Sequence, residues 1–351
     1  LAGLRLSAWR AGTPPPPRAR PHPAARPAAP AAAVRLPAWF TRHRDTLRYV
    51  LPAYAGLVIV LVVTEAVYGN TLTSGKYYDS LIVLGSFLAI LALGQGAAIL
   101  TGGLDLSIPW TIGFCGILVA GLIRGSDEVA LWAIPLGLAI GLVIGLVNGL
   151  GIVILGLPPI VMTLASNGIL QGLALVYSNG TPDGFASPGL RSFMTGNWLG
   201  VTPVVWFTAL FAAAAWFVLA RTTFGRRIYA VGNSPVVAKL SGIGVGSTLI
   251  GVYMLSGFCA ALVGILLAGF SGQASLGMGD EYLLPSIAVV VVGGTLITGG
   301  RGHYLGMLGG VLLLTALSTL LAGTTLPHAV RDIIFGLVVL GAVLALRERT
   351  S

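Results

Sequence analysis

The sequence predicts an all-α, polytopic membrane protein with about ten transmembrane helices, and three observations support this prediction. Long apolar stretches follow one another from about residue 48 to the C-terminus. Hydrophobic residues make up 56% of the chain and charged residues only 9%, whereas soluble domains contain about 25% charged residues. Fifty of the 351 residues are glycine, which permits the close helix contacts typical of membrane bundles.

The N-terminal segment, residues 1–47, differs in composition from the rest and is rich in Pro, Ala and Arg. The first 48 residues hold nine arginines and one acid, Asp45, and so supply +8 of the formal net charge of +9. The high net charge is therefore no indication of nucleic-acid binding. We expect a disordered cytoplasmic tail, with an organellar transit peptide or an over-extended start as alternatives, followed by a transmembrane domain over 48–347.

Apolar runs between polar residues define the predicted spans. A helix needs about 20 apolar residues to cross the hydrocarbon core, where backbone groups must be paired within the segment, and most of these runs approach or exceed that length. The predicted spans are 48–68, 80–100, 105–123, 130–155, 159–178, 203–220, 247–270, 284–298, 304–323 and 329–346.

Basic residues in short loops predict the orientation, because Lys and Arg are retained on the cytoplasmic side. The predicted inner loops and C-terminus hold seven of them, Arg221, Arg226, Arg227, Lys239, Arg301, Arg347 and Arg349. The predicted outer loops hold four, Lys76, Arg124, Arg191 and Arg331. Both termini are therefore expected in the cytoplasm.

A ladder of small residues, Gly137, Gly141, Gly145 and Gly149, repeats every four positions and so occupies one helix face. This pattern predicts close packing against another helix. The two cysteines, Cys115 and Cys259, lie inside apolar spans and have neither metal-site nor disulfide spacing.

Two loops are long and hydrophilic. The outer loop, 178–202, is rich in turn-forming residues and can either dock a partner or cap the bundle.

The inner loop, 221–246, contains a short predicted helix. Asn233 or Ser234 can cap it, Pro235 fits its first turn, and Gly242 can end it. Its apolar edge comprises Val236, Val237 and Leu240. Such a short helix needs a surface to pack on, either the protein's own helix ends or a partner subunit.

Signatures of catalysis are missing from the sequence. Gly75-Lys76 is followed by Tyr77 and lacks the upstream glycine of a phosphate-binding loop, no GxSxG motif occurs, and no two histidines have zinc-protease spacing. Nearly all of the eleven acids fall in loops or at span edges, whereas ion-coupled transporters place carboxylates inside spans. We therefore predict no catalytic residues and no metal site.

Asp105 is the exception among the acids. It lies in TGGLDLSIPW (101–110), which interrupts the apolar pattern, and irregular backbone at membrane depth occurs only when it is buried in protein or lines a watery path. Asp105 or Ser107 can alternatively cap the next helix. Other uncharged polar groups inside spans can bind a polyol or bridge helices. They are Gln95, Asn148, Ser166, Asn167 and Gln171.

Four motifs in order carry a resemblance to a known family. They are TGGLDLS (101–107), GLVNGLGIVILGLPPIVMTLASNGILQGLALV (145–176), TTFGRRIYAVGNSPVVAKLSGI (222–243) and LLPSIAVVVVGGTLITGGRG (283–302). Over about residues 80–346 the chain resembles the permease subunit of bacterial ABC importers of the ribose/xylose type, within the broader group that includes branched-chain amino acid permeases.

The resemblance implies an ABC importer permease fold, a multi-pass protein of the bacterial inner membrane that is not itself an enzyme. Its expected partners are an ATP-binding subunit, an extracytoplasmic solute-binding protein and a second permease, identical or paralogous. ATP and Mg²⁺ are expected on the partner, and no cofactor on this chain. AVGNSPVVAKLSGI (230–243) resembles the segment that docks into the ATPase. The coupling residues carried over are Gly232, Asn233, Ser234, Pro235, Lys239, Leu240 and Gly242.

The predicted function is import of a monosaccharide or polyol across the inner membrane, driven by ATP that the partner hydrolyses. Asp105, Ser107, Asn148, Asn167 and Gln171 are the predicted substrate-path residues. Import of amino acids or nucleosides by the same machinery is one alternative, and a self-sufficient secondary transporter is another. The scarcity of buried carboxylates argues against the secondary transporter.

Overall fold

The computed structural model describes residues 38–325 and 327–346. Contacts divide the chain into two units, 1–42 and 43–351, and the fold below is that of the second unit. The predicted end of the tail, residue 47, lies inside the first helix, α1 (Ala38–Tyr68). The rest of the tail prediction, over 1–37, lies outside the described residues.

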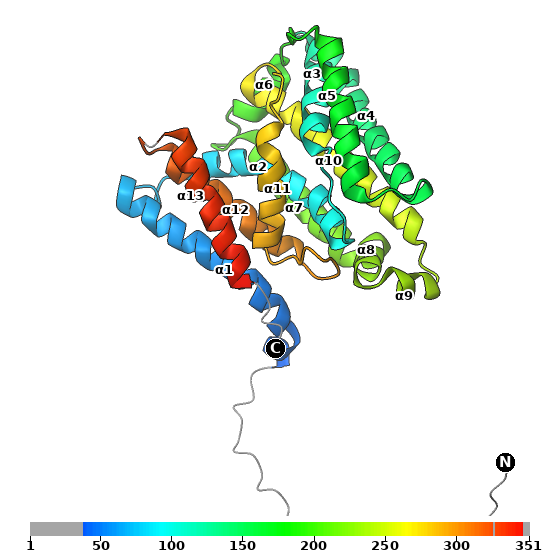
Figure 1. Cartoon of the computed structure of the whole chain (residues 1–351). Helices are drawn as coiled ribbons and strands as arrows, with labels where there is room; N and C mark the ends of the chain where they lie inside the picture. The colour runs from blue at the N-terminus through cyan, green and yellow to red at the C-terminus, as the bar shows by residue number, and fades with distance from the viewer. Residues whose placement is uncertain (1–37, 326, 347–351) are drawn as a thin grey trace, which may run out of the picture. The chain divides into compact units, whose positions relative to one another are not determined.

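The described residues form helices joined by short turns, together with two isolated β-bridges. After α1 the order is α2 (Gly75–Leu100), α3 (Ile108–Ile123), α4 (Asp127–Ile154), α5 (Pro159–Ser178), α6 (Pro188–Thr195), α7 (Pro203–Arg221), α8 (Thr223–Asn233), α9 (Pro235–Leu240), α10 (Val245–Ser271), η1 (Asp280–Tyr282), α11 (Leu283–Val292), α12 (Tyr304–Ala322) and α13 (His328–Leu346). Figure 1 labels the α-helices α1 to α13. The all-α prediction is confirmed.

Each of the ten predicted spans overlaps one of these helices. Within the described ranges, seven helices are long and apolar enough to cross a bilayer: α1 from Val50, α2, α4, α5, α7, α10 and α12. At 16 residues, α3 is shorter, about 24 Å long at 1.5 Å per residue. The count of ten spans stays a prediction.

The predicted span 284–298 is wrong as a continuous helix. α11 ends at Val292 after 10 residues, about 15 Å, roughly half of the 30 Å hydrocarbon thickness. Gly293 and Gly294 follow, and Gly294 takes a positive φ of 85° that ends the helix. The chain then pairs its own backbone in a turn, with Leu296 N donating to Arg301 O at 3.0 Å.

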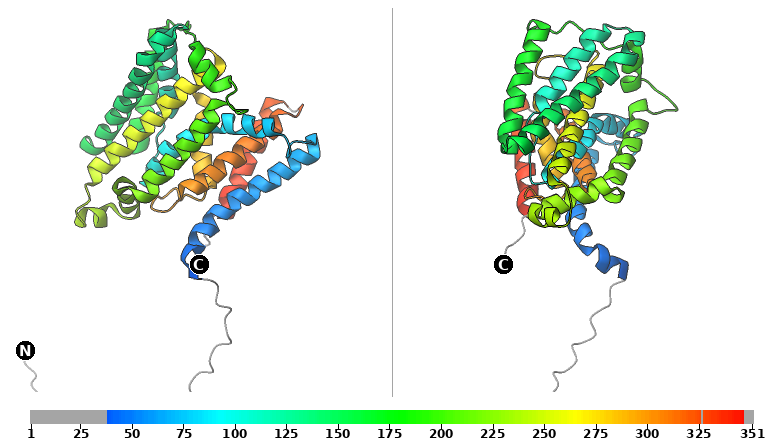
Figure 2. Two further views of the ribbon diagram at one scale, coloured as in Figure 1. Left: turned by 180° about the vertical axis from the view of Figure 1, so that it is seen from behind. Right: turned by 90° about the vertical axis from the view of Figure 1, so that its right-hand side faces the viewer.

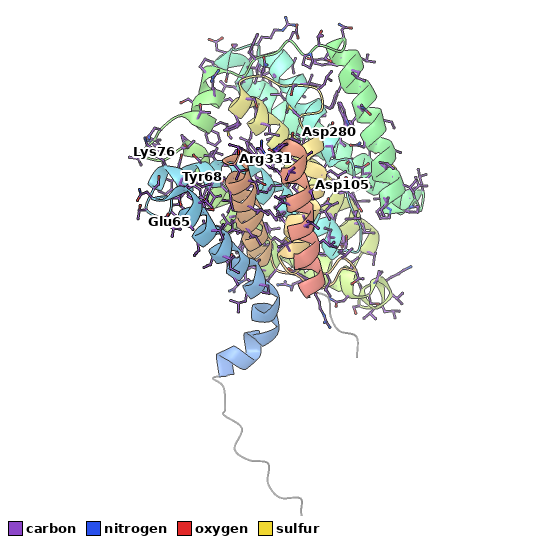
Figure 3. All side chains as sticks on the ribbon, turned by 60° about the vertical axis from the view of Figure 1, so that its left-hand side comes forward. Glu65, Tyr68, Lys76, Asp105, Asp280 and Arg331 are labelled. Carbon is purple, nitrogen blue, oxygen red and sulfur yellow. The ribbon has the colours of Figure 1, made fainter. Side chains whose placement is uncertain are left out.

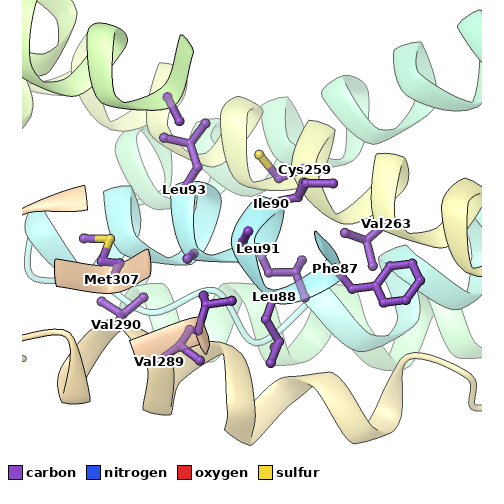
Figure 4. Close-up of a cluster of buried hydrophobic side chains, with 14 of the residues drawn as sticks. Phe87, Leu88, Ile90, Leu91, Leu93, Cys259, Val263, Val289, Val290 and Met307 are labelled. Atoms are coloured by element: carbon purple, nitrogen blue, oxygen red, sulfur yellow. The ribbon is translucent and has the colours of Figure 1, made fainter. Parts of the chain in front are cut away.

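The centre of the second unit is α2. In its most apolar stretch 89% of residues are buried, compared with 22% in those of α1, α5 and α7. Figure 4 shows side chains of α2, among them Phe87 and Leu91, packed against Val263 of α10, Val289 of α11 and Met307 of α12. The apolar outer faces of α1, α5 and α7 therefore remain available to lipid or to another chain.

The glycine ladder of α4 lies against α10, as the sequence predicts. A Cβ on Gly145 would stand 2.6 Å from Met254 Cα, and one on Gly149 would stand 2.7 Å from Ile250 Cα. Both obstacles are backbone atoms, which cannot rotate away. The two helices therefore pack backbone to backbone, and only glycine fits at the contact.

Two sets of turns lie at opposite ends of these helices. At one end, the turn after α3 meets the 178–202 loop, where Gly125 N donates to Phe185 O at 3.1 Å and Arg124 pairs with Asp183 at 3.5 Å. At the other end lie α8 and α9, which stay together in both views of Figure 2. The turn after α11 joins them there, because Tyr229 OH donates to Gly302 O at 3.0 Å.

Gly145→Ala should destabilise the protein, because the added methyl group overlaps the backbone of α10. We expect a loss of about 1–3 kcal/mol, seen as a lower thermal midpoint in detergent. Gly172→Ala on α5 is the matched control, since a Cβ there has no atom within 4 Å. The control should keep or raise the midpoint, because alanine is the better helix former. Equal midpoints for the two variants would contradict the packing of α4 on α10.

Candidate functional site

A buried polar cluster lies where the irregular segment 101–107 meets α4 and α5. Asp105 Oδ1 accepts hydrogen bonds from the N–H and the hydroxyl of Ser107, at 2.9 and 2.6 Å. The Ser107 hydroxyl accepts from Asn148 Nδ2 of α4 at 2.9 Å, and Asn148 Oδ1 accepts from Ser166 of α5 at 2.5 Å. All four side chains are buried. We call this set, Asp105, Ser107, Asn148 and Ser166, the Asp105 cluster.

Side chains from other helices pair the irregular backbone beside this cluster. Asp105 N donates to Gln95 Oε1 of α2 at 3.3 Å, and Leu106 N donates to Thr163 Oγ1 of α5 at 3.0 Å. Trp110 N, in the first turn of α3, donates to Asn167 Oδ1 at 3.2 Å. These bonds pair the backbone groups that the missing helix leaves open, as a buried non-helical segment requires.

The alternative that Ser107 caps α3 through its side chain needs correction, whereas the Asp105 carboxylate does accept the N–H of Ser107 at the start of that helix. Ser107 is the residue before α3, but its side chain makes no capping bond. Its hydroxyl is turned to Asp105 instead, and the free N–H of Trp110 is taken by Asn167 of α5. One capping bond of α3 is therefore supplied from a neighbouring helix, which spacing along the chain does not indicate.

Four buried polar atoms around the cluster have no partner at hydrogen-bonding geometry in the described part of the chain. They are Asp105 Oδ2, Gln95 Nε2, Tyr253 OH and Ser256 Oγ. Tyr253 and Ser256 of α10 both lie near the Asp105 carboxyl. Together these atoms offer hydrogen-bond donors and acceptors that the described part of the chain leaves unused.

The five predicted path residues do not all gather at one place. Asp105, Ser107 and Asn148 belong to the cluster, and Asn167 is bonded beside it. Gln171 lies one turn further along α5 and is exposed on this chain. A role of any of them in binding solute stays a prediction.

A cavity of about 820 Å³, which the sequence does not reveal, lies between η1, α11, α12 and α13. Asp280, Glu281 and Arg331 lie on its wall, and the remainder of the wall is mostly apolar. Figure 3 labels Asp280 and Arg331, which come from neighbouring elements far apart in the sequence. In the sequence, these three residues share only a position at the predicted outer ends of spans. That position does not reveal that α11 and α13 lie side by side.

The predicted coupling segment contains two helices, α8 and α9, where the sequence indicated one. For α9, Ser234 is the cap, since its hydroxyl accepts from Val237 N at 3.3 Å, and Pro235 occupies the first turn as predicted. Gly242 takes a φ of 78° just after the helix, and Ile243 N donates back to Ala238 O at 2.9 Å. These are the bonds of a glycine-terminated helix end.

The outer edge of α9 is apolar and exposed. Val236, Val237 and Leu240 are 69%, 60% and 83% exposed, whereas Ala238 on the opposite face is 2% exposed. Lys239 is exposed beside them. A helix of six residues thus rests on the protein through one small residue and presents three large apolar side chains outward. This arrangement is typical of a docking surface.

Metal ligands do not gather in the described ranges 38–325 and 327–346, where no three His, Cys, Asp or Glu side chains come together. Cys115 and Cys259 are both buried and free of disulfide bonds.

Comparison with known proteins identifies relatives over most of the chain. A family model described as branched-chain amino acid transport system / permease component matches residues 77–343. The ribose import permease protein of Bacillus subtilis is 36% identical over 88% of this chain and 96% of its own length.

Two further relatives are the autoinducer 2 import system permease protein of Klebsiella pneumoniae, 34% identical over 83% of each chain, and the galactose/methyl galactoside import permease protein of Escherichia coli, 32% identical over 75% of this chain and 84% of its own. No solved structure matches the chain. The match across 77–343 shows that the chain belongs to the family of branched-chain amino acid transport system permease components.

Proposed function

We propose that the chain is the membrane-spanning permease subunit of an ATP-driven ABC importer for a monosaccharide or related polyol. The observation that carries the proposal is the exposed apolar edge of α9, a surface that needs a partner outside the membrane. Relatives named for ribose and galactose import, similar over three quarters of the chain or more, support the solute class. The neutral hydrogen-bonding groups around Asp105 suit such a solute.

The energy comes from a partner in this proposal. ATP and Mg²⁺ bind to a separate ATP-binding subunit, which docks on Val236, Val237 and Leu240, with Lys239 at the edge of the contact. The permease supplies no chemical step. It changes the access of its central path when the ATP-binding subunits close and move α9.

The proposed location is the bacterial inner membrane, with α8, α9 and both termini on the cytoplasmic side. The predicted inner turns support this orientation, because 221–246 and 299–303 meet at one end of the helices. The predicted outer turns meet at the other end, as the contact between Arg124 and Asp183 indicates. Basic residues then concentrate on the cytoplasmic side, as expected for a membrane protein.

A second permease subunit, identical or paralogous, completes the path. The outer faces of α1, α5 and α7, on which most apolar side chains are exposed, offer surface for it as well as for lipid. The extracytoplasmic solute-binding protein is assigned to the opposite end from α9, where α6 and the 178–202 loop lie. Specificity then resides largely in the binding protein, and the permease binds solute weakly enough to release it.

Reconstitution in liposomes tests the proposed function. The chain is combined with its ATP-binding subunit and its solute-binding protein, and uptake of radiolabelled D-ribose, D-xylose and D-galactose is measured. We expect accumulation of at least one sugar, only with ATP and both partners present. Accumulation by the chain alone, driven by an ion gradient, would show a secondary transporter and refute the proposal.

Leu240→Glu should prevent docking of the ATP-binding subunit, because a carboxylate would replace the most exposed apolar side chain of α9. The expected result is loss of the ATP-binding subunit from the purified complex, at unchanged amounts of permease in the membrane. Leu199→Glu is the matched control, since Leu199 is 78% exposed in the 178–202 loop. Retention of the ATP-binding subunit by Leu240→Glu would rule out this docking surface.

Asp105→Asn should raise the solute concentration for half-maximal uptake if the cluster contacts solute. The change keeps the size of the side chain and the acceptor that Ser107 uses, but puts a donor in place of Oδ2. A lost hydrogen bond to the solute costs about 1–2 kcal/mol, so a rise of roughly tenfold is expected. Asp79→Asn, where Thr202 is the partner, is the control and should leave this concentration unchanged. Unchanged kinetics in both variants would remove Asp105 from the path.

A further inference from the structure

Three segments of backbone meet at the end of the helices that carries α9: the C-terminus of α8, the turn 299–302 and the C-terminus of α2. Asn233 Nδ2 donates to Gly300 O at 3.0 Å and to Tyr229 O at 2.7 Å. Tyr229 OH donates to Gly302 O at 3.0 Å. Gly300 N donates to Leu100 O at 2.9 Å. We call these contacts the inner clasp.

Glycines let the three backbones touch. A Cβ on Gly232 would overlap Leu100 O, and one on Gly299, which has a φ of 87°, would stand 2.9 Å from that same oxygen. No flexible side chain separates α8 from the end of α2 at this point. α8 and the turn 299–302 therefore both lie directly against the backbone of Leu100.

The clasp involves a hydroxyl that keeps its proton. Burial raises the pKa of Tyr229 to about 12, so its hydroxyl remains a donor to Gly302 at physiological pH. Asn233 has no titrating group, and its amide donates to two carbonyl oxygens at once. Both side chains donate to the protein's own backbone, although Asn233 is exposed and Tyr229 is half-buried. Val236, Val237 and Leu240, in contrast, are exposed apolar side chains with no such bonds to make.

From Leu100 the chain leads directly to the Asp105 cluster. Thr101 to Leu104 form the connecting turn, in which Gly103 N donates to Ala98 O at 2.9 Å. A Cβ on Gly103 would overlap the Tyr253 hydroxyl of α10. The cluster five residues beyond Leu100 is bonded to Asn148 of α4 and Ser166 of α5. The inner clasp and the cluster are thus two ends of one short, close-packed segment.

We propose that Tyr229 and Asn233 are positioning residues that transmit movement of the coupling segment, through the 299–302 turn and Leu100, to the Asp105 cluster. The inference rests on the proposed function and deepens it. α9 receives the ATP-binding subunit, and the inner clasp carries the resulting movement to the segment that bonds α4 and α5 together. Without the clasp, ATP hydrolysis continues but moves less solute.

The test measures ATP hydrolysis and solute uptake in the same liposomes, for the full complex with its ATP-binding subunit and binding protein. The probe is whichever of radiolabelled D-ribose, D-xylose and D-galactose the unmodified complex accumulates. Tyr229→Phe removes only the hydroxyl that reaches Gly302. Tyr68→Phe is the matched control, since Tyr68 OH makes the same kind of bond, to Leu320 O at 2.9 Å, away from the clasp.

For Tyr229→Phe we expect solute transported per ATP hydrolysed to fall about fivefold, with the ATP-binding subunit still bound and hydrolysis retained. Asn233→Ala should act in the same direction, and the double variant should lose less than the product of the two losses, because both belong to one unit. The Tyr68→Phe control should keep the ratio of the unmodified complex.

Two results would overturn the inference. Uptake and hydrolysis falling in equal proportion in Tyr229→Phe would assign Tyr229 to docking or stability only. An unchanged transport ratio in both Tyr229→Phe and Asn233→Ala would show that movement passes by another route. Failure of the proposed function is distinguishable from both, because the unmodified complex would then accumulate no sugar with ATP.

Discussion

Backbone groups at membrane depth must be paired inside the protein, and the rest of this structure depends on how that requirement is met at two breaks. In hydrocarbon an unpaired N–H or C=O costs several kcal/mol, so unbroken helices are the default. The chain departs from that default at 101–107 and again after Val292. At the first break, Gln95, Thr163 and Asn167 supply the missing partners from α2 and α5. The second break pairs largely with itself and with Leu100.

The two non-helical segments lie next to each other, since Gly300 N donates to Leu100 O, and they differ in where their hydrogen-bond partners come from. A break that borrows its hydrogen bonds from other helices fixes the position of those helices. The segment 101–107 ties α2 to α4 and α5, whereas the turn 299–302 ties the inner end of α2 to α8. α2 is also the most buried of the seven candidate spans. A displacement of its end at Leu100 would therefore change its contacts with most of the helices around it. A permease needs such coupling, because its path must respond to a partner that never enters the membrane.

Glycine plays two different parts in this architecture. Along α4 it removes side chains between two straight helices, so that α4 and α10 pack as backbone surfaces. At Gly294, Gly299 and Gly300 it supplies positive φ angles in the turn after α11. The first use is periodic and visible as a four-residue repeat. The second use forms the inner clasp and has no period, and the sequence shows it only as a local run of glycines.

The sequence alone determined the class of fold, the approximate positions of the spans, the packing role of Gly145 and its neighbours, and the capped helix that begins after Ser234. Each of these follows from local composition or from a repeat along one helix. Tertiary structure alone decided that α11 stops at Val292, that Asn167 of another helix bonds the start of α3, and that Asn233 donates to Gly300 O. The two hydrogen bonds join residues that are 57 and 67 positions apart in the sequence. The end of α11 depends on which groups pair with the backbone that follows it. A one-dimensional pattern encodes which face of a helix is apolar, but not which neighbouring helix meets that face.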